Sequence, residues 1–572
     1  MAAAAAGLIA AAPAEAVTVT KTVTVVSTAP VLITTPNRPP TGYHLTASRV
    51  ERIAAASPVI RAELRRHPRA IPYEYTKGDR TWQVSWFSRG RHQIELAQVY
   101  VSDVTGQVTQ AWTGFQVAWS MARGYPGAFG RSVNHWYVWI PLCLLFLAPF
   151  LPWPSLRRRR RETPSPEPPW RPSLLHLDLL VLLAFSISLV LFNHARIGLS
   201  VPLVYPCLIY LLVRMLLLAF GRGWPRAPLR LTIPVPVLVI GVVFLVGFRI
   251  GLNVSNSNVI DVGYAGVIGA DKLLHGHNLY GHWPSDNAEG DTYGPANYYA
   301  YVPFRAVFGW SGTWDSLPAA HAAAIAFDLL TLLGLFVLGR RIRGPTLGVV
   351  LAYAWASYPF TLWSLSSNTN DALVGLMVIA ALLVVGSAPA RGVVGALAGL
   401  TKFAPLALVP LLWRGTGEGW PRRRSSVSFI LAFVATLLVA MLPVLLDDNW
   451  RAFWHDTIVY QAQRTTPFSV WGLWGGLGFE QHLVEGAAIA LGLIVAVVPR
   501  RRGLVEMAAL AGAVLIGLQL AGGYWLYSYI VWFFPAVAVA LFGVFPARVG
   551  EVVTERAREP ARWPSPALAR SL

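Results

Sequence analysis

The chain has 572 residues, of which 55% are hydrophobic and only 13% are charged, and its mean hydropathy is +0.49. Soluble domains carry about twice that share of charge, so the composition excludes an ordinary soluble enzyme and predicts a membrane protein. The formal net charge of +19 would suit nucleic acid, but the arginines cluster between apolar runs, and we therefore expect no nucleic-acid partner.

Three segments precede the first long apolar run. Residues 1–17 are rich in alanine and end in an A-x-A-like sequence, which resembles a signal peptide without its usual basic start. Residues 18–42 are rich in Thr, Val and Pro and predict a linker. Residues 43–130 predict a small extracytoplasmic α+β domain. Its expected elements are a helix that a capping box at Ser48 opens and that runs to about His67, and strands at 70–75, 81–87, 95–102 and 107–112.

A turn at residues 103–106 is expected between the last two strands. The helix followed by a meander that ends in D-x-x-G-x-V resembles a PepSY-like module. Because resemblance of fold does not give function, we favour a structural ectodomain without chemistry of its own. Ligand sensing, or regulation of the membrane part, is the alternative.

Eleven apolar runs are long enough to cross a bilayer. Arginine clusters follow alternate runs, and the positive-inside rule then places the N-terminal domain outside and the basic tail, residues 546–572, in the cytoplasm. The sequence thus predicts a polytopic α-helical protein of the plasma membrane, with a three-span extension at 136–230 and a core at 231–545. The predicted spans are 136–153, 173–195, 200–219, 231–251, 317–339, 345–363, 371–387, 426–446, 482–498, 503–521 and 526–545.

The alternation of charge fails once, because Arg391 and residues 414–424 are both basic although residues 392–413 would cross between them. Glycines, Pro405 and Lys402 interrupt that segment. A broken, re-entrant hairpin of two half-helices restores the alternation. Lys402 would then lie at mid-depth, where an ionisable group is costly and commonly functional. It would neutralise a phosphate, or pair with Asp328 in a structural ion pair.

The outer loop at residues 252–317 is the most informative part of the chain, because it places carboxylates, amides, histidines and tyrosines between apolar spans. Tyr264, Val267 and Ile268 follow Asp261 at helical spacing, and a second such pattern follows Pro295, so we expect two helices on the membrane surface. This chemistry predicts a reaction centre at the outer membrane face.

The string from Asp261 through Tyr264 to Asp271, followed by Gly276-His-Asn-Leu-Tyr280, resembles the aspartate–tyrosine and glycine–tyrosine pattern of glycosyltransferase family 87. The resemblance covers residues 231–545 and implies a core of the GT-C class. It implies an inverting transferase that uses a polyprenyl-phosphate sugar donor and a lipid or glycan acceptor of the cell envelope. Mannose is the implied sugar, with arabinose or another hexose as alternatives.

The resemblance implies that Asp261 is the general base, a role that needs a carboxylate within reach of the acceptor proton. An N-cap for the following helix is the alternative. Asp291, just before a turn, is the rival catalytic carboxylate. The residues expected to bind donor or acceptor are Tyr264, Tyr280, Tyr293, Asn297, Asn368, Asn370, Lys402, Arg464 and Trp471.

A later outer loop, residues 447–481, supplies two of these residues. The guanidinium of Arg464 suits the phosphate of the donor lipid, and Trp471 would stack on the sugar or the polyprenyl chain. The alternatives are an arginine that reaches lipid head groups and a tryptophan of the interfacial belt. Asn368 and Asn370 would bind sugar hydroxyls, or only cap the next helix.

No cofactor is required by these residues. His275, His277 and His282 are spaced like metal ligands but lack a clear fourth partner, so a divalent metal is compatible with the site and no ligand set is assigned. The two cysteines, Cys143 and Cys207, both lie in apolar runs, which excludes a disulfide framework and a thiolate zinc site.

Two other classes of function fit parts of the sequence. The broken hairpin and the intramembrane Asp328 and Lys402 would suit a transporter or flippase, but no internal repeat of spans accompanies them. The N-terminal domain would suit a membrane sensor, but no cytoplasmic output domain is recognisable. The glycosyltransferase is the leading hypothesis.

Overall fold

The computed structural model describes residues 30–77, 80–90, 93–114, 117, 129–151, 173–463 and 466–546. The chain divides into two compact units, Met1–Trp119 and Ser120–Leu572. The predicted signal peptide, the first part of the predicted linker, Arg464 and nearly all of the basic tail lie outside the described residues.

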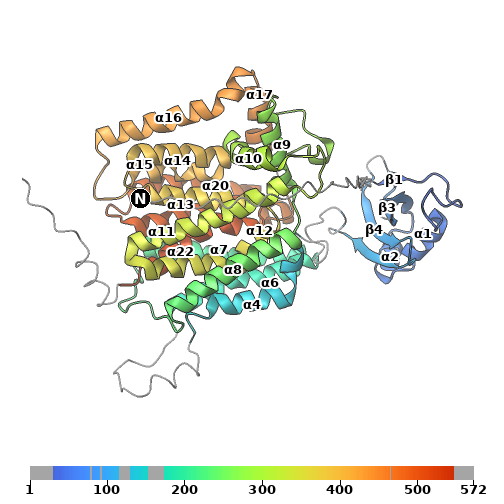
Figure 1. The fold of residues 1–572 in the computed structure, drawn as a ribbon, viewed down its shortest axis with the longest axis horizontal. Coiled ribbons are helices and arrows are strands. Elements are labelled where there is room, and N and C mark those ends of the chain that lie inside the picture. Colours follow the sequence, from blue (N-terminus) through green and yellow to red (C-terminus); the bar gives the residue numbers. More distant parts are fainter. Residues whose placement is uncertain are drawn as a thin grey trace, which may run out of the picture. The chain divides into compact units, whose positions relative to one another are not determined.

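The N-terminal unit is an antiparallel meander of five strands in the order β1-β2-β3-β4-β5, with two helices (Figure 1). Its core forms because Trp82, Val84 and Trp86 alternate along β3 and pack with helix residues such as Val50 and Ile60. Its elements are β1 (Val31–Leu32), α1 (Ala47–Ala55), α2 (Pro58–Arg66), β2 (Ile71–Thr76), β3 (Thr81–Phe87), β4 (Glu95–Ser102) and β5 (Val108–Thr113).

The four predicted strands are confirmed to within one residue, and residues 31–32 of the predicted linker add β1 at the edge of the sheet. The single predicted helix is wrong, because the chain breaks at Ser57 and Pro58 starts a second helix, as proline at a first helical position commonly does. The capping box is also wrong. Thr46 is the N-cap, and the Ser48 hydroxyl bonds to Pro36 O at 2.9 Å instead. The PepSY-like assignment stays a prediction.

The second unit is a bundle of helices that spans most of the chain (Figure 1). Its helices up to residue 308 are η2 (Arg131–Asn134), α4 (Trp136–Leu147), α6 (Leu174–Asn193), α7 (Ile197–Ala219), α8 (Val235–Ser255), α9 (Asp261–Leu274), η3 (Ser285–Asn287) and α10 (Pro295–Phe308). The next are α11 (Pro318–Ser357), α12 (Pro359–Ser366), α13 (Asp371–Leu383), α14 (Ala388–Thr401), η4 (Ala404–Leu408), α15 (Val409–Arg414) and α16 (Arg423–Leu446). The last are α17 (Trp450–Phe453), η5 (Trp454–Val459), α18 (Tyr460–Gln463), α19 (Val470–Leu473), α20 (Gly478–Val497), α21 (Leu504–Ala521), η6 (Tyr527–Tyr529) and α22 (Ile530–Gly543).

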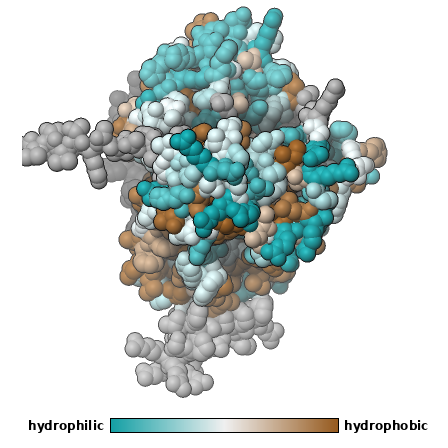
Figure 2. Space-filling view, turned by 90° about the vertical axis from the view of Figure 1, so that its right-hand side faces the viewer, coloured by the Kyte–Doolittle hydropathy of each residue, from teal (hydrophilic) through white to brown (hydrophobic). Residues whose placement is uncertain are grey.

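Seven helices of the described residues are long and apolar enough to cross a membrane, namely α6, α7, α8, α11, α16, α20 and α21. The predicted count of eleven spans is therefore not confirmed. The runs at 136–153, 371–387 and 526–545 contain shorter apolar helices, and the runs at 317–339 and 345–363 share α11, which breaks at Arg343 and Gly344. In the lower part of Figure 2, hydrophobic residues cover the surface at the height at which Figure 1 shows α4 and α6.

The broken hairpin appears in the fold. Helix α14 ends at Thr401, Lys402 is extended with φ −142° and ψ 146°, and η4 and α15 lead the chain back. At the base of the hairpin the Arg391 guanidinium donates to Leu412 O at 2.6 Å, so the two basic ends lie on the same side. Helix α16 runs along the outside of the bundle over α14 (Figure 1). The depth of Lys402 in a bilayer stays a prediction.

Candidate functional site

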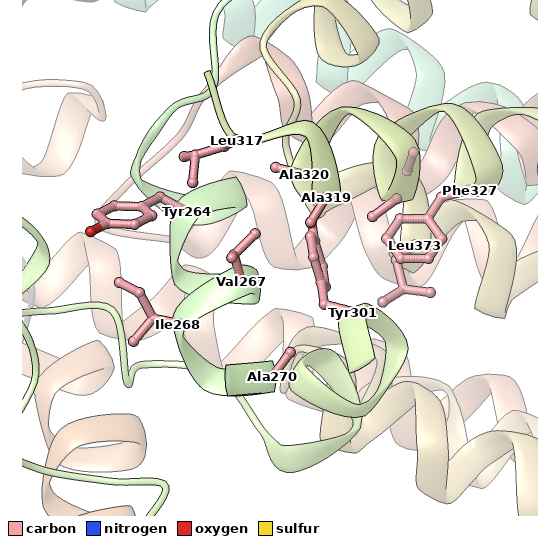
Figure 3. Packing of buried hydrophobic residues seen from close by; sticks show 12 residues of the cluster. Tyr264, Val267, Ile268, Ala270, Tyr301, Leu317, Ala319, Ala320, Phe327 and Leu373 are labelled. Atoms are coloured by element: carbon pink, nitrogen blue, oxygen red, sulfur yellow. The ribbon is translucent and has the colours of Figure 1, made fainter. Parts of the chain in front are cut away.

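The two helices expected in the outer loop are α9 and α10, and they pack directly on each other. A Cβ on Gly266 would lie 2.6 Å from the ring of Tyr301, so only glycine lets that ring lie on α9. Figure 3 shows Tyr301 between Val267 of α9 and Phe327 of α11. The apolar face of α9 therefore packs on the protein core and fixes the loop to α11.

Asp261 is the exposed first residue of α9, and Ile260 is the N-cap. The N-cap interpretation of Asp261 is therefore wrong, although a carboxylate in the first turn still interacts favourably with the helix dipole. The backbone around it is held in place, because Asn287 Nδ2 donates to Asp261 O at 3.0 Å and Ile260 N donates to Ser367 O at 3.3 Å. The result is an exposed carboxylate on a fixed backbone, in the helix that follows the apolar helix α8.

Asp291 has the opposite environment, since it is only 4% exposed and accepts a hydrogen bond from Gly281 N at 2.8 Å. Burial raises the pKa of its carboxyl to about 6, against the lowering effect of the Gly281 hydrogen bond, and the nearby Asp456 raises it further. Lys272 lies close by and donates to Gly281 O at 2.8 Å. Burial lowers the pKa of this lysine, and the charge of Asp291 partly compensates.

Two of the predicted tyrosines are core residues whose hydroxyls already have hydrogen-bond partners in the loop. Tyr264 is fully buried, and its ring is tilted against that of Trp314 with the ring centroids 4.9 Å apart. Its hydroxyl lies 3.4 Å from Asp286 Oδ2. Tyr280 is buried as well and donates to Tyr293 O at 2.8 Å. Both hydroxyls thus hold parts of the loop to one another.

A second group of predicted residues meets at the break in the hairpin. The Lys402 ammonium lies 2.5 Å from Asp371 Oδ1, and Trp532 Nε1 donates to the same oxygen at 2.7 Å. The ammonium also lies 5.2 Å from the ring centroid of Tyr293, 5.4 Å from that of Tyr529 and 5.0 Å from that of Trp532. We call Asp371, Lys402 and these three rings the hairpin centre. Such cation–π contacts stabilise a desolvated lysine.

Asn297 and Asn370 lie beside the hairpin centre, where Asn370 Nδ2 donates to Asn297 Oδ1 at 2.9 Å. Four of the predicted binding residues are therefore gathered in one place, namely Tyr293, Asn297, Asn370 and Lys402. These residues come from α10 and the loop before it, the turn before α13 and the end of α14.

The expected pairing of Lys402 with Asp328 is wrong. Asp328 instead forms a buried ion pair with Arg249 of α8, and Trp355 Nε1 donates to it at 2.9 Å. The two intramembrane charges that suggested transport are thus each paired. Sequence reasoning missed Arg249, although a lone arginine inside an apolar run is a visible signal. Nothing in the sequence pointed to Trp532 or to Tyr529.

The other predicted residues lie apart from the hairpin centre. Asn368 is fully buried and holds the turn to the outer loop, accepting from Asn253 Nδ2 at 2.8 Å and donating to Asn258 O at 3.0 Å. Trp471 is half-buried and donates to Leu520 O at 2.9 Å, and Arg464 lies outside the described residues.

Metal binding finds no support at the three histidines of the loop. Over the described ranges, no three His, Cys, Asp or Glu side chains come together as a ligand set. The ring of His275 instead contacts Asp271 O at 2.9 Å, at helical spacing.

The comparison with known proteins connects this architecture to a family. No curated protein matches the chain. The family match begins at residue 292, after Asp261 and Asp291, and it includes Tyr293, Asn297, Asn370 and Lys402. Over residues 292–528 the chain matches the model of Glycosyltransferase family 87, a family of the GT-C class, and this match supports a membrane glycosyltransferase.

Proposed function

We propose that the protein transfers a sugar from a polyprenyl-phosphate donor to a lipid or glycan acceptor of the cell envelope, at the outer membrane face. Mannose is the first sugar to test, with arabinose or another hexose next. Asp261 is the general base. The observation that carries this assignment is its exposed carboxylate on a fixed backbone at the start of α9. A base must reach the acceptor proton, which the buried Asp291 is poorly placed to do.

The reaction is a single displacement. The acceptor hydroxyl attacks the anomeric carbon while Asp261 takes its proton, and the new C–O bond forms opposite the bond that breaks. The bond between the anomeric carbon and the phosphate oxygen gives its electron pair to the phosphate, which leaves as polyprenyl phosphate. Inversion at the anomeric carbon follows. Lys402, and Arg464 in the later outer loop, are the cations proposed to stabilise the leaving phosphate.

Sugar transfer from a panel of radiolabelled polyprenyl-phosphate sugars tests the proposal. Membranes would carry the wild type, Asp261→Asn or Asp291→Asn, with equal amounts of inserted protein. We expect transfer by the wild type, a loss of roughly 10²- to 10⁴-fold in Asp261→Asn, and substantial transfer by Asp291→Asn.

Other outcomes change the proposal in defined ways. Collapse only in Asp291→Asn would keep the enzyme and move the base to Asp291. No transfer from any donor by inserted wild-type protein would reject this donor class, and flux of the same lipids in proteoliposomes would then be measured.

A further inference from the structure

Three buried polar atoms near Asp371 have no hydrogen-bond partner among the described residues. They are Asn297 Nδ2, Tyr301 OH and Asn370 Oδ1, and all three side chains are fully buried. A buried polar atom left in this state costs about 1–3 kcal/mol, and such atoms in a native fold require an explanation. Asn297 and Tyr301 are four residues apart and so lie on one face of α10, and Asn370 contacts that face.

The surroundings of these atoms define what could satisfy them. The hairpin centre supplies a cation at Lys402, a carboxylate at Asp371 and the ring faces of Tyr293, Tyr529 and Trp532. Amide and phenol groups exchange hydrogen bonds with hydroxyls, ring faces cover the apolar side of a sugar ring, and an ammonium binds phosphate. A purely apolar ligand would leave the three polar atoms unsatisfied.

We infer that the hairpin centre, together with Asn297, Tyr301 and Asn370, is the subsite for the sugar-phosphate head group of the donor. The inference rests on the proposed function for the identity of the donor. The sugar hydroxyls bond to the three polar atoms, and the phosphate receives the Lys402 ammonium. Asp371 is a positioning residue, because it holds the ammonium at the hairpin tip and does not touch the reacting atoms.

Binding then involves an exchange of partners. The Lys402 ammonium turns from Asp371 Oδ1 toward the phosphate, while Asp371 keeps the hydrogen bond from Trp532 Nε1. A lysine suits this role because its single ammonium on a flexible stem can change partner without a fixed fork geometry. Tyr293 and Tyr529 are the partly exposed walls of the hairpin centre, so the head group enters between these two rings.

Binding of undecaprenyl phosphate and of uncharged undecaprenol to the full-length protein in nanodiscs tests the phosphate part. We expect Lys402→Gln to weaken binding of undecaprenyl phosphate at least tenfold and to leave undecaprenol unchanged. Lys402→Arg should retain part of the affinity. Lys272→Gln is the matched control, because this lysine lies in the outer loop and is not part of the hairpin centre. Unchanged affinity in a Lys402→Gln protein that still binds undecaprenol would overturn the inference.

Donor kinetics test the sugar part. Tyr301→Phe removes one hydroxyl and keeps the ring, so we expect it to raise KM for the sugar donor several-fold while binding of undecaprenyl phosphate stays unchanged. Asn297→Ala should act in the same direction. A fall in kcat with unchanged KM would contradict the subsite. The two proposals can be rejected separately. If binding of undecaprenyl phosphate depends on Lys402 but no sugar is transferred, the proposed enzyme activity is rejected. If sugar is transferred but binding does not depend on Lys402, the proposed subsite is rejected.

Discussion

Two of the buried ion pairs of the membrane unit differ in how completely their polar groups are used. Arg249 and Asp328 join α8 to α11, and the guanidinium also donates to Ala356 O and Thr361 Oγ1, both at 3.1 Å. Trp355 adds a further bond to the carboxylate. Lys402 and Asp371 are also buried, but their neighbours Asn297, Tyr301 and Asn370 each keep one unsatisfied polar atom.

Under the proposed function, this difference separates a structural pair from a functional one. A buried pair with every donor and acceptor used gains nothing from a ligand and serves to fix two helices. Unsatisfied polar groups beside a buried pair destabilise the fold, and a ligand that forms hydrogen bonds with them can offset that cost. The choice of cation agrees with this division, since the forked guanidinium of Arg249 suits a permanent network and the ammonium of Lys402 suits exchange.

Breaking the first pair should give the largest loss of stability. Asp328→Leu leaves the Arg249 guanidinium buried without its carboxylate, at an expected cost of about 3–5 kcal/mol. The double variant Arg249→Met/Asp328→Leu should recover most of that loss, because apolar residues of similar volume replace the pair. Thermal unfolding in detergent, followed by tryptophan fluorescence, measures both. Equal destabilisation of the single and double variants would show that the pair does more than join α8 to α11.

The same double replacement at the second pair should separate stability from activity. Lys402→Met/Asp371→Leu should recover the stability that Asp371→Leu alone loses, yet transfer should stay reduced by about 10²-fold, because no cation faces the leaving phosphate. Sugar transfer and thermal unfolding on the same preparations measure the two effects. Recovery of transfer together with stability would make this pair structural as well.

A substitution next to the hairpin centre tests how tightly the outer loop must pack on it. A Cβ on Gly294 would overlap the carbonyl oxygen of Leu400 at the end of α14, so Gly294→Ala must move the loop that carries Tyr293. We expect a loss of about 1–3 kcal/mol in stability together with a higher KM for the donor. Gly247→Ala is the control, because a Cβ there meets nothing within 4 Å in α8. Equal effects of the two variants would contradict the close approach.

Local pattern and charge predicted the framework of the fold. The alternation of Trp82, Val84 and Trp86 with polar residues indicated β3, and the arginines around residues 392–413 indicated a chain that turns back, which the contact of Arg391 with Leu412 confirms. The break before Pro58 was missed although proline signals it. The predicted number of spans stays unconfirmed, because apolar composition alone does not distinguish a short helix buried among others from one that crosses a bilayer.

The site was predicted as a set of residue types and not as a set of contacts. Asn297 and Asn370 were both predicted to bind donor or acceptor, but their contact joins positions 73 residues apart. Trp532 reaches Asp371 across 161 residues, and no spacing rule relates such positions. The pairing of charges was the least predictable feature. Asp328 was the expected partner of Lys402, but Lys402 pairs with Asp371, and the packing of α8 on α11 assigns Asp328 to Arg249.

The smallest expected effect concerns Asp291, the buried carboxyl of the outer loop. The pKa of Asp291 is raised from the ordinary 3.8 to about 6, first by burial. The folded protein therefore holds this proton more tightly than the unfolded chain. The stabilising contribution of the protonated group is complete below about pH 4 and is lost as the pH rises toward 6.

Asp291→Asn stays neutral at every pH, and its side-chain oxygen can still accept the hydrogen bond from Gly281 N. The unfolding midpoint of the wild type should fall relative to that of Asp291→Asn between pH 4 and 6, whereas parallel profiles would mean that the outer loop solvates Asp291 when it is charged.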